Sequence, residues 1–197
     1  MPTGVALRDV REQLFAAAER VLLRDGPYLL TSRAVTAEAG VAKGVLHRHF
    51  TDFDDFLTEL VLNRIGRVER QAESLLEWAG QGSLVANLAT ALQQIFNPVA
   101  VAMVSLITFR DDLRARLRSA RGRPGIPLLS EAGEMVAAYL AAEKEHGRLA
   151  PGADVETLAP MVIGSGHLLF ADRSDATPSP AAVERMVAAA LSGAVRG

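Results

Sequence analysis

The chain has 197 residues, of which 49% are hydrophobic and 22% charged, so it can build one large or two small cores and is not expected to be disordered. Cysteine is absent, which excludes disulfides, thiolate metal sites and cysteine nucleophiles and fits a reducing cytoplasm. The net charge of −2 excludes a protein that is basic throughout, so an anionic partner would have to meet a local patch. We expect no secretory signal and no membrane association, because the first residues lack the signal pattern and the apolar stretches are short.

The first fifty residues predict three helices. Apolar residues follow helical spacing as far as Leu22, and Gly26-Pro27 supplies a stop. Thr31 can cap a short helix over 32–39, and a second short helix follows over about 43–49. Because helix nucleation is costly, two helices this short must pack against the first helix to be stable.

The remainder of the chain also predicts helices, and no period-two alternation is long enough for a strand. Asp52 is a strong N-cap for a helix over 53–79, about 40 Å long at roughly 1.5 Å per residue. Further helices are expected at about 83–96, 98–109, 110–121, 128–146, 155–171 and 180–195, the last two capped by Asp154 and Ser179. The predicted fold class is all-α with about nine helices.

Residues 31–50 are the most informative stretch. A small residue (Ala39), a turn glycine (Gly40) and an apolar residue (Val41), followed by Leu46 five positions later, describe a helix-turn-helix. Leu46 and Phe50 are expected to hold the second helix down while its small and polar side chains point outward. Such a protruding helix suits entry into the major groove of DNA.

The run Ala39-Gly-Val-Ala-Lys-Gly-Val-Leu-His-Arg-His-Phe50, followed by an acid-capped helix, resembles the DNA-binding signature of the tetracycline-repressor (TetR) family over about residues 8–65. The resemblance implies a helix-turn-helix DNA-binding domain, here 1–52, and a helical effector-binding and dimerisation domain, here 53–197. No cofactor is expected.

Four positions depart from the family pattern. Ala42 stands where Ser or Thr is common, His47 where Tyr is usual, and Val45 where Thr is frequent. Phe53 replaces a lysine that often contacts phosphate, so one such contact is expected to be missing.

The predicted DNA-contacting residues lie on both short helices. Lys43 and Arg48 could pair with phosphate or guanine, and the helix start near Thr31 could attract phosphate, although capping alone would explain that threonine. His47 and His49 point about 200° apart on a helix, so they cannot grip one metal ion. The full predicted set is Thr31, Ser32, Arg33, Ala42, Lys43, Gly44, Val45, His47, Arg48 and His49.

Aromatic and apolar residues of the second half are candidates for a ligand cavity, although their spacing equally describes an ordinary core. His167, a polar group among apolar neighbours, is the best hydrogen-bonding candidate. The predicted ligand set is Trp78, Phe96, Met103, Ile107, Phe109, Met135, Tyr139 and His167. Segment 110–123 carries six arginines and two aspartates; it can be a solvated face, a second electrostatic contact or a lure for an acidic effector.

A single helix-turn-helix recognises few base pairs, so two copies about 34–36 Å apart are expected on a DNA operator. The last two helices offer small and apolar faces for a four-helix homodimer seam, as the resemblance implies: Gly164, Ser165, Gly166, Val183, Met186, Val187, Ala190 and Leu191.

The leading hypothesis is a cytoplasmic DNA-binding transcriptional regulator, a repressor released from a palindromic operator by an unknown small-molecule effector. The alternatives are a helical small-molecule- or partner-binding protein without DNA activity and a small helical enzyme. The enzyme hypothesis lacks a catalytic constellation, because Gly164-Ser-Gly166 is no nucleophile elbow and no His-Glu-x-x-His occurs.

Overall fold

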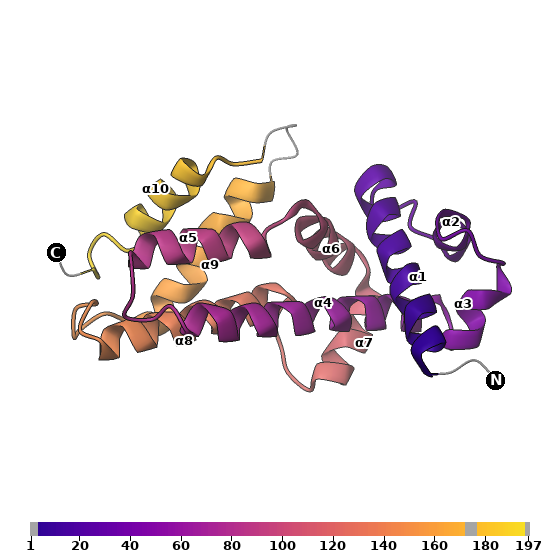
Figure 1. Ribbon diagram of the computed structural model, residues 1–197, viewed down its shortest axis with the longest axis horizontal. Helices are drawn as coiled ribbons and strands as arrows, with labels where there is room; N and C mark the ends of the chain where they lie inside the picture. The colour runs from indigo at the N-terminus through magenta and orange to yellow at the C-terminus, as the bar shows by residue number, and fades with distance from the viewer. Residues whose placement is uncertain (1–3, 172–176, 196–197) are drawn as a thin grey trace. The chain divides into compact units, whose positions relative to one another are not determined.

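The computed structural model describes residues 4–171 and 177–195, with side chains from Val10 onward, and these residues form ten helices (Figure 1). The all-α prediction is confirmed, and the helix number is one higher than the expected nine. The helices are α1 (Gly4–Asp25), α2 (Ser32–Glu38), α3 (Gly44–His49), α4 (Phe53–Leu76), α5 (Leu84–Ile95), α6 (Pro98–Phe109), α7 (Asp111–Arg121), α8 (Leu129–Glu145), α9 (Val155–Ala171) and α10 (Pro180–Ala190).

Polar caps begin several helices where the sequence predicted them. The Thr31 hydroxyl accepts a hydrogen bond from the Ala34 amide at 3.1 Å, and Asp52 Oδ1 accepts one from the Asp55 amide at 2.7 Å. Ser179 caps α10 in the same way. These bonds satisfy amides that have no partner inside the helix, which explains why the predicted starts are confirmed.

Two predicted helix ends differ from the structure. Helix α4 ends at Leu76 instead of residue 79, because the amides of Trp78 and Ala79 bond to carbonyls three residues back and tighten the turn. Helix α10 ends at Ala190 instead of residue 195. The polar loop predicted at 172–178 lies largely outside the described residues.

The chain forms two compact units. Unit 1 comprises residues 1–63 and 102–126, and unit 2 comprises residues 64–101 and 127–197. Helices α4 and α6 each contribute residues to both units, so the boundaries run inside helices and not through linkers. The functional division at residues 52 and 53 concerns activity and stays a prediction.

Unit 1 is built around α1, against which α2 packs, and α2 in turn contacts α3. Three phenylalanines meet in its core: the ring centroid of Phe15 lies 5.8 Å from that of Phe50 and 5.6 Å from that of Phe56. Because one ring comes from α1 and another from α4, this cluster fixes the end of α3 between the two longer helices.

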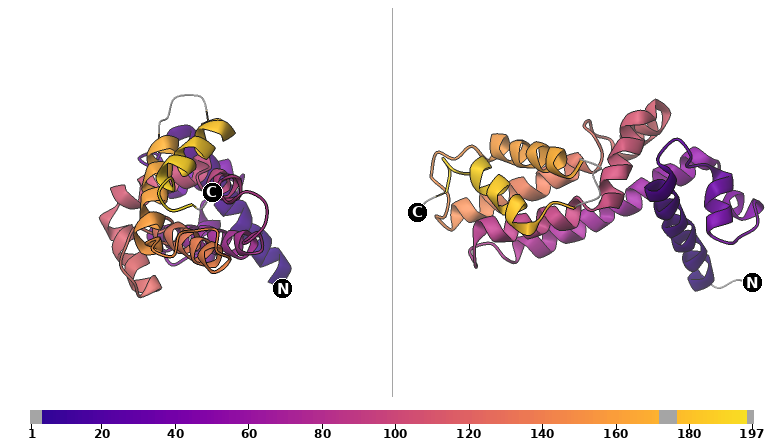
Figure 2. Two further views of the ribbon diagram at one scale, coloured as in Figure 1. Left: turned by 90° about the vertical axis from the view of Figure 1, so that its left-hand side faces the viewer. Right: turned by 90° about the horizontal axis from the view of Figure 1, so that it is seen from above.

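In unit 2, α9 packs against both α8 and α10, and α10 also packs against α5 (Figure 2). Phe96 and Phe170 stack in the core with ring centroids 5.6 Å apart. Gly166 lets α9 come close to Phe96, since a Cβ on this glycine would lie 2.9 Å from a ring carbon. No single helix within 4–171 or 177–195 is long and apolar enough to cross a bilayer; α5 and α6 pass that test only as a bent pair.

Candidate nucleic-acid interface and ligand pocket

A glycine turn joins α2 to α3. Gly40 has φ of 67°, in the left-handed region that glycine adopts without steric cost. The Val41 amide bonds to the Thr36 carbonyl at 3.0 Å, which closes the end of α2. The chain therefore reverses within a few residues and starts α3 at a defined angle, as in a helix-turn-helix.

Helix α3 is pinned from beneath. Leu46 is fully buried and Phe50 is 3% exposed, which confirms the two residues predicted to hold this helix. Arg11 donates to the His49 carbonyl at 3.2 Å and lies 4.4 Å from the ring centroid of Phe50, and Gln13 donates to the turn carbonyl of Ala39 at 2.8 Å. Arg11 therefore links α1 to the end of α3.

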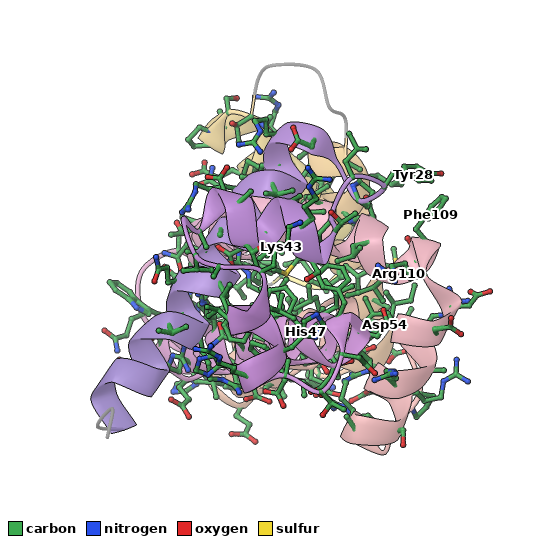
Figure 3. All side chains as sticks on the ribbon, turned by 90° about the vertical axis from the view of Figure 1, so that its right-hand side faces the viewer. Tyr28, Lys43, His47, Asp54, Phe109 and Arg110 are labelled. Carbon is green, nitrogen blue, oxygen red and sulfur yellow. The ribbon has the colours of Figure 1, made fainter. Side chains whose placement is uncertain are left out.

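None of the ten predicted DNA-contacting residues is buried. Seven are exposed (Thr31, Arg33, Ala42, Lys43, Gly44, His47 and Arg48), and Ser32, Val45 and His49 are half-buried. Figure 3 shows Lys43 and His47 on the face of the helix-turn-helix that is turned toward the viewer. The hydroxyl of Thr31 is already used as a cap, whereas Lys43, the N-cap residue of α3, makes no side-chain cap bond.

Two arginines of α1 are neutralised by a carboxylate of α2. Arg20 and Arg24 each contact a different oxygen of Glu38, both at 2.7 Å. These hydrogen bonds, with Arg20 contributing most, hold the pKa of Glu38 below its usual value. These two ion pairs to a single carboxylate fix α2 to α1.

Three cationic side chains of the helix-turn-helix take no part in these ion pairs. Arg33, Lys43 and Arg48 form no ion pair with any described residue, and each is exposed. Their charges are therefore available to an external anion. They lie on α2, at the start of α3 and within α3, so the positive charge follows both helices of the motif.

The arginines of segment 110–123 have a role that sequence reasoning missed. Arg110 contacts Asp54 at 2.8 Å and Arg116 contacts Asp52 at 2.9 Å, so α7 is bound to the start of α4 (Figure 3). The Asp55 amide, followed by Arg116, lowers the pKa of Asp52. The partners lie 56 and 64 residues apart in the chain, which no local pattern could reveal.

The predicted ligand residues of unit 1 do not share one environment. Met103 and Ile107 are fully buried in the core. Phe109 is 56% exposed and makes an edge-on contact with Tyr28, with ring centroids 4.3 Å apart (Figure 3).

The remaining predicted ligand residues belong to unit 2. Phe96, Met135 and Tyr139 are buried in its core. His167 is half-buried with its ring centroid 6.0 Å from that of Phe96, and burial lowers the pKa of its imidazole. Its Nδ1 is buried without a hydrogen-bond partner among the described residues.

Trp78 alone of the eight predicted ligand residues lines the pocket found in unit 2, between the end of α4 and α5. This pocket has a volume of about 240 Å³, and its other lining residues are Gln71, Ser74, Leu75, Asn87, Thr90, Ala91 and Gln94. Sequence reasoning missed the polar ones because amides and hydroxyls on half-exposed helix faces follow no distinctive spacing.

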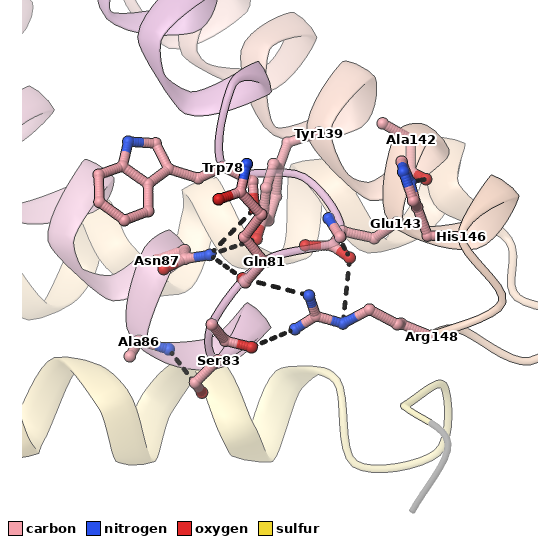
Figure 4. Close-up of polar contacts among 12 residues, drawn as sticks. Trp78, Gln81, Ser83, Ala86, Asn87, Tyr139, Ala142, Glu143, His146 and Arg148 are labelled. Carbon is pink, nitrogen blue, oxygen red and sulfur yellow. Dashed lines mark hydrogen bonds and ion pairs between the residues drawn. The ribbon is translucent and has the colours of Figure 1, made fainter.

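A buried carboxylate fixes the loop that carries Trp78 (Figure 4). Glu143 on α8 is fully buried and accepts a hydrogen bond from the Gly80 amide at 3.3 Å. Arg148 contacts the same Glu143 oxygen at 3.3 Å and donates to the carbonyls of Gln81 and Gly82. Burial, followed by the bond to Glu143, raises the pKa of Tyr139, so its phenol stays protonated at neutral pH.

Comparisons with known proteins agree with this arrangement. Residues 14–60 match the family model described as "Bacterial regulatory proteins, tetR family". No curated protein matches the chain, whereas 117 chains of solved structures do. A putative TetR-family transcriptional regulator from Mesorhizobium loti is 18% identical with a TM-score of 0.71, covering 99% of this chain and 100% of that chain.

Two other solved structures come from named regulators. FadR from Bacillus subtilis, in complex with stearoyl-CoA, is 19% identical with a TM-score of 0.70 and covers 92% of this chain and 98% of its own. SmeT, the repressor of a multidrug efflux pump of Stenotrophomonas maltophilia, is 16% identical with a TM-score of 0.65 and covers 94% and 90%. At these identities the likeness shows a shared fold.

Proposed function

We propose that this chain is a TetR-family transcriptional regulator, a repressor that binds a palindromic operator as a homodimer and is released by a small-molecule effector. The match of residues 14–60 to the family model and the shared fold support this proposal. The observation that carries this proposal is the division of charges in the helix-turn-helix. Arg20 and Arg24 are neutralised by Glu38, whereas Arg33, Lys43 and Arg48 are exposed and have no carboxylate partner within the described part of the chain.

Helix α3 enters the major groove in this proposal. Lys43 and Arg48 pair with phosphate or guanine, and His47 reaches a base edge or a phosphate. Ala42 and Gly44 are exposed small residues that let the start of α3 come close to the DNA. Val45 contacts a thymine methyl group, while residues 31–33 of α2 contact the neighbouring backbone.

We assign the two functions on either side of the expected boundary: residues 1–52 bind DNA, and residues 53–197 bind the effector and dimerise. The solved structures of similar fold support an effector, since one of them holds stearoyl-CoA and another is the repressor of a drug efflux pump. We place the protein in the cytoplasm, where its operator is, and assign it no catalytic role.

The homodimer forms through α9 and α10. Gly164 and Ser165 are exposed, and Met161 and Leu168, one turn to either side, are 50% and 76% exposed and extend the same face of α9. Of the other residues expected in the seam, Met186 and Ala190 are half-buried, whereas Gly166, Val183, Val187 and Leu191 are buried within the protomer and support this face from behind. The seam is therefore centred on Met161, Gly164, Ser165 and Leu168.

An effector releases the protein from its operator if it binds more tightly to the conformation in which the spacing of the two α3 helices does not match that of the operator half-sites. The DNA affinity then falls by that preference, which is typically about 1–3 kcal/mol.

The test is selection of bound sites from random duplex DNA, followed by affinity measurements over a salt series. We expect a palindromic site. Arg48→Ala should weaken its binding by about 1–3 kcal/mol if Arg48 contacts guanine, or reduce the slope of log K against log salt by about 0.9 if it contacts phosphate. Arg118→Ala, which removes an exposed arginine of α7, is the matched control and should leave the affinity unchanged.

If the folded dimer binds no duplex at low salt, the repressor proposal fails, and a helical ligand-binding protein without DNA activity becomes the better description. Equal losses for Arg48→Ala and Arg118→Ala would contradict the assignment of α3 as the reading helix.

A further inference from the structure

The pocket beside Trp78 combines one exposed aromatic face with amide and hydroxyl groups and no charged side chain. We propose that it binds a small, neutral, polyhydroxylated ligand the size of a monosaccharide, and that this ligand is the effector. The second part of this statement rests on the proposed function, whereas the first does not.

Hydrogen bonds hold the side-chain amide of Asn87 in one orientation and leave its oxygen free to accept a hydrogen bond. Its side-chain nitrogen donates to the carbonyls of Gln81 at 2.9 Å and Trp78 at 3.4 Å, and lies 3.2 Å from the hydroxyl of Tyr139. These partners use both amide hydrogens, so Oδ1 remains as an acceptor. In Figure 4 the dashed lines at Asn87 all leave its side-chain nitrogen.

Two hydroxyls of the pocket are also acceptors. Ser74 donates to the Arg70 carbonyl at 3.2 Å, and Thr90 donates to the Ala86 carbonyl at 2.9 Å. Each hydroxyl has its single hydrogen in a bond within its own helix, so only its lone pairs face a ligand. These acceptors therefore favour a ligand that is rich in hydrogen-bond donors.

Gln71 and Gln94 complete the pattern. Their side-chain amides lie at the pocket and make no hydrogen bond with another described residue. Each offers both a donor and an acceptor, which matches sugar hydroxyls, because a hydroxyl donates one hydrogen bond and accepts others. Acceptors alone would suit an amine, so the two amides favour hydroxyl groups.

Charge and size narrow the ligand class further. A charged ligand would lose water here without a compensating ion, because no Asp, Glu, Lys or Arg lines the pocket. The volume of about 240 Å³ is below the roughly 300–1,000 Å³ of pockets for drug-sized ligands, so a long acyl chain does not fit. Trp78, 57% exposed, offers a flat face for the C–H face of a sugar ring.

Trp78 is the single tryptophan of the chain, so intrinsic fluorescence reports directly on this pocket. We would titrate the full chain with a panel of neutral pentoses and hexoses, and in parallel with gluconate and glucosamine as charged analogues. We expect at least one neutral sugar to give a saturable change below about 10 mM, and the charged analogues to bind more weakly.

Two variants connect the signal to the pocket. Thr90→Val and Gln94→Leu each remove one polar group from an α5 face that is not in the core, and each should weaken binding by roughly two- to tenfold. Thr108→Val is the matched control, because Thr108 makes the same bond within its helix, to the Val104 carbonyl at 2.9 Å, but does not line the pocket.

The inference is overturned if no neutral sugar changes the fluorescence, or if Thr90→Val and Gln94→Leu both leave the affinity at the wild-type value. Measuring the same sugar against the selected operator separates the two proposals. Loss of sugar binding with intact operator binding defeats only this inference. Sugar binding that leaves the operator affinity unchanged sustains the ligand class and defeats its role as effector.

Discussion

At the scale of single residues, Gly166 is the position where a missing side chain matters most. A Cβ there would lie 2.9 Å from Cε2 of Phe96, a ring that is 2% exposed and stacked on Phe170. Because the ring is enclosed, it cannot move aside cheaply. We expect Gly166→Ala to lower the free energy of unfolding by about 1–3 kcal/mol, as measured by urea denaturation.

The control is Gly133→Ala in α8, where a Cβ would meet nothing within 4 Å. This change should raise stability by up to about 1 kcal/mol, because alanine favours the helix. Equal effects of the two substitutions would show that α9 does not depend on this close approach.

Residue exposure also marks the limit of sequence reasoning. The motif predicted which residues of α3 point outward and that Leu46 and Phe50 point inward, because a six-residue helix on a core has only one possible apolar side. It could not predict which arginines have partners. The neutralisation of Arg20 depends on Glu38, eighteen residues away, and that of Arg116 on Asp52, so both follow from tertiary packing.

At the scale of elements, one carboxylate, that of Glu38, joins α2 to two arginines of α1. The pKa of Glu38 is lower in the folded chain than its ordinary value, so the unfolded chain binds a proton more readily. The stabilisation is therefore complete above the unfolded pKa of about 4.3 and is lost as the pH falls through the folded value.

We accordingly expect Glu38→Gln to reduce stability at pH 7 and to flatten the loss of stability below about pH 4.3, measured by circular dichroism during acid titration with added urea. Glu69→Gln removes an exposed carboxylate of α4 that has no ion pair among the described residues, and it should reproduce the wild-type profile. A steep acid transition in Glu38→Gln identical to wild type would refute this origin of the pH dependence.

Helix starts were more predictable than helix ends. Thr31, Asp52 and Ser179 each accept a bond from an amide three residues later, a local pattern that the sequence contains in full. The ends of α4 and α10 lie three and five residues earlier than expected, because apolar residues continue past the last helical turn into packed loops. The pocket could not be predicted from the sequence either, because its polar groups come from two helices joined by a folded loop.

At the scale of the whole molecule, the proposed homodimer would let the two α3 helices bind one operator together. Leu168 is 76% exposed on the α9 face proposed as the seam. We expect Leu168→Glu to convert the dimer into a monomer in light-scattering measurements, since it would place a charge in an apolar contact, and to reduce operator affinity at least tenfold.

Leu76→Glu is the matched control, because Leu76 is 41% exposed at the end of α4, a helix that is not part of the proposed seam. It should leave the dimer intact. A wild-type protein that is monomeric at micromolar concentration, or a Leu168→Glu variant that stays dimeric, would contradict the proposed seam.

The interleaved make-up of unit 1 has a practical consequence for protein engineering. Residues 102–126 return to the unit formed by residues 1–63, and Arg110 and Arg116 reach the aspartates at the start of α4. A chimera spliced at residue 63 would carry residues 1–63 without these two arginines, so Asp54 and Asp52 would both lose their ion-pair partners. A transfer of the proposed DNA-binding unit to another protein therefore needs both stretches of chain, residues 1–63 and 102–126.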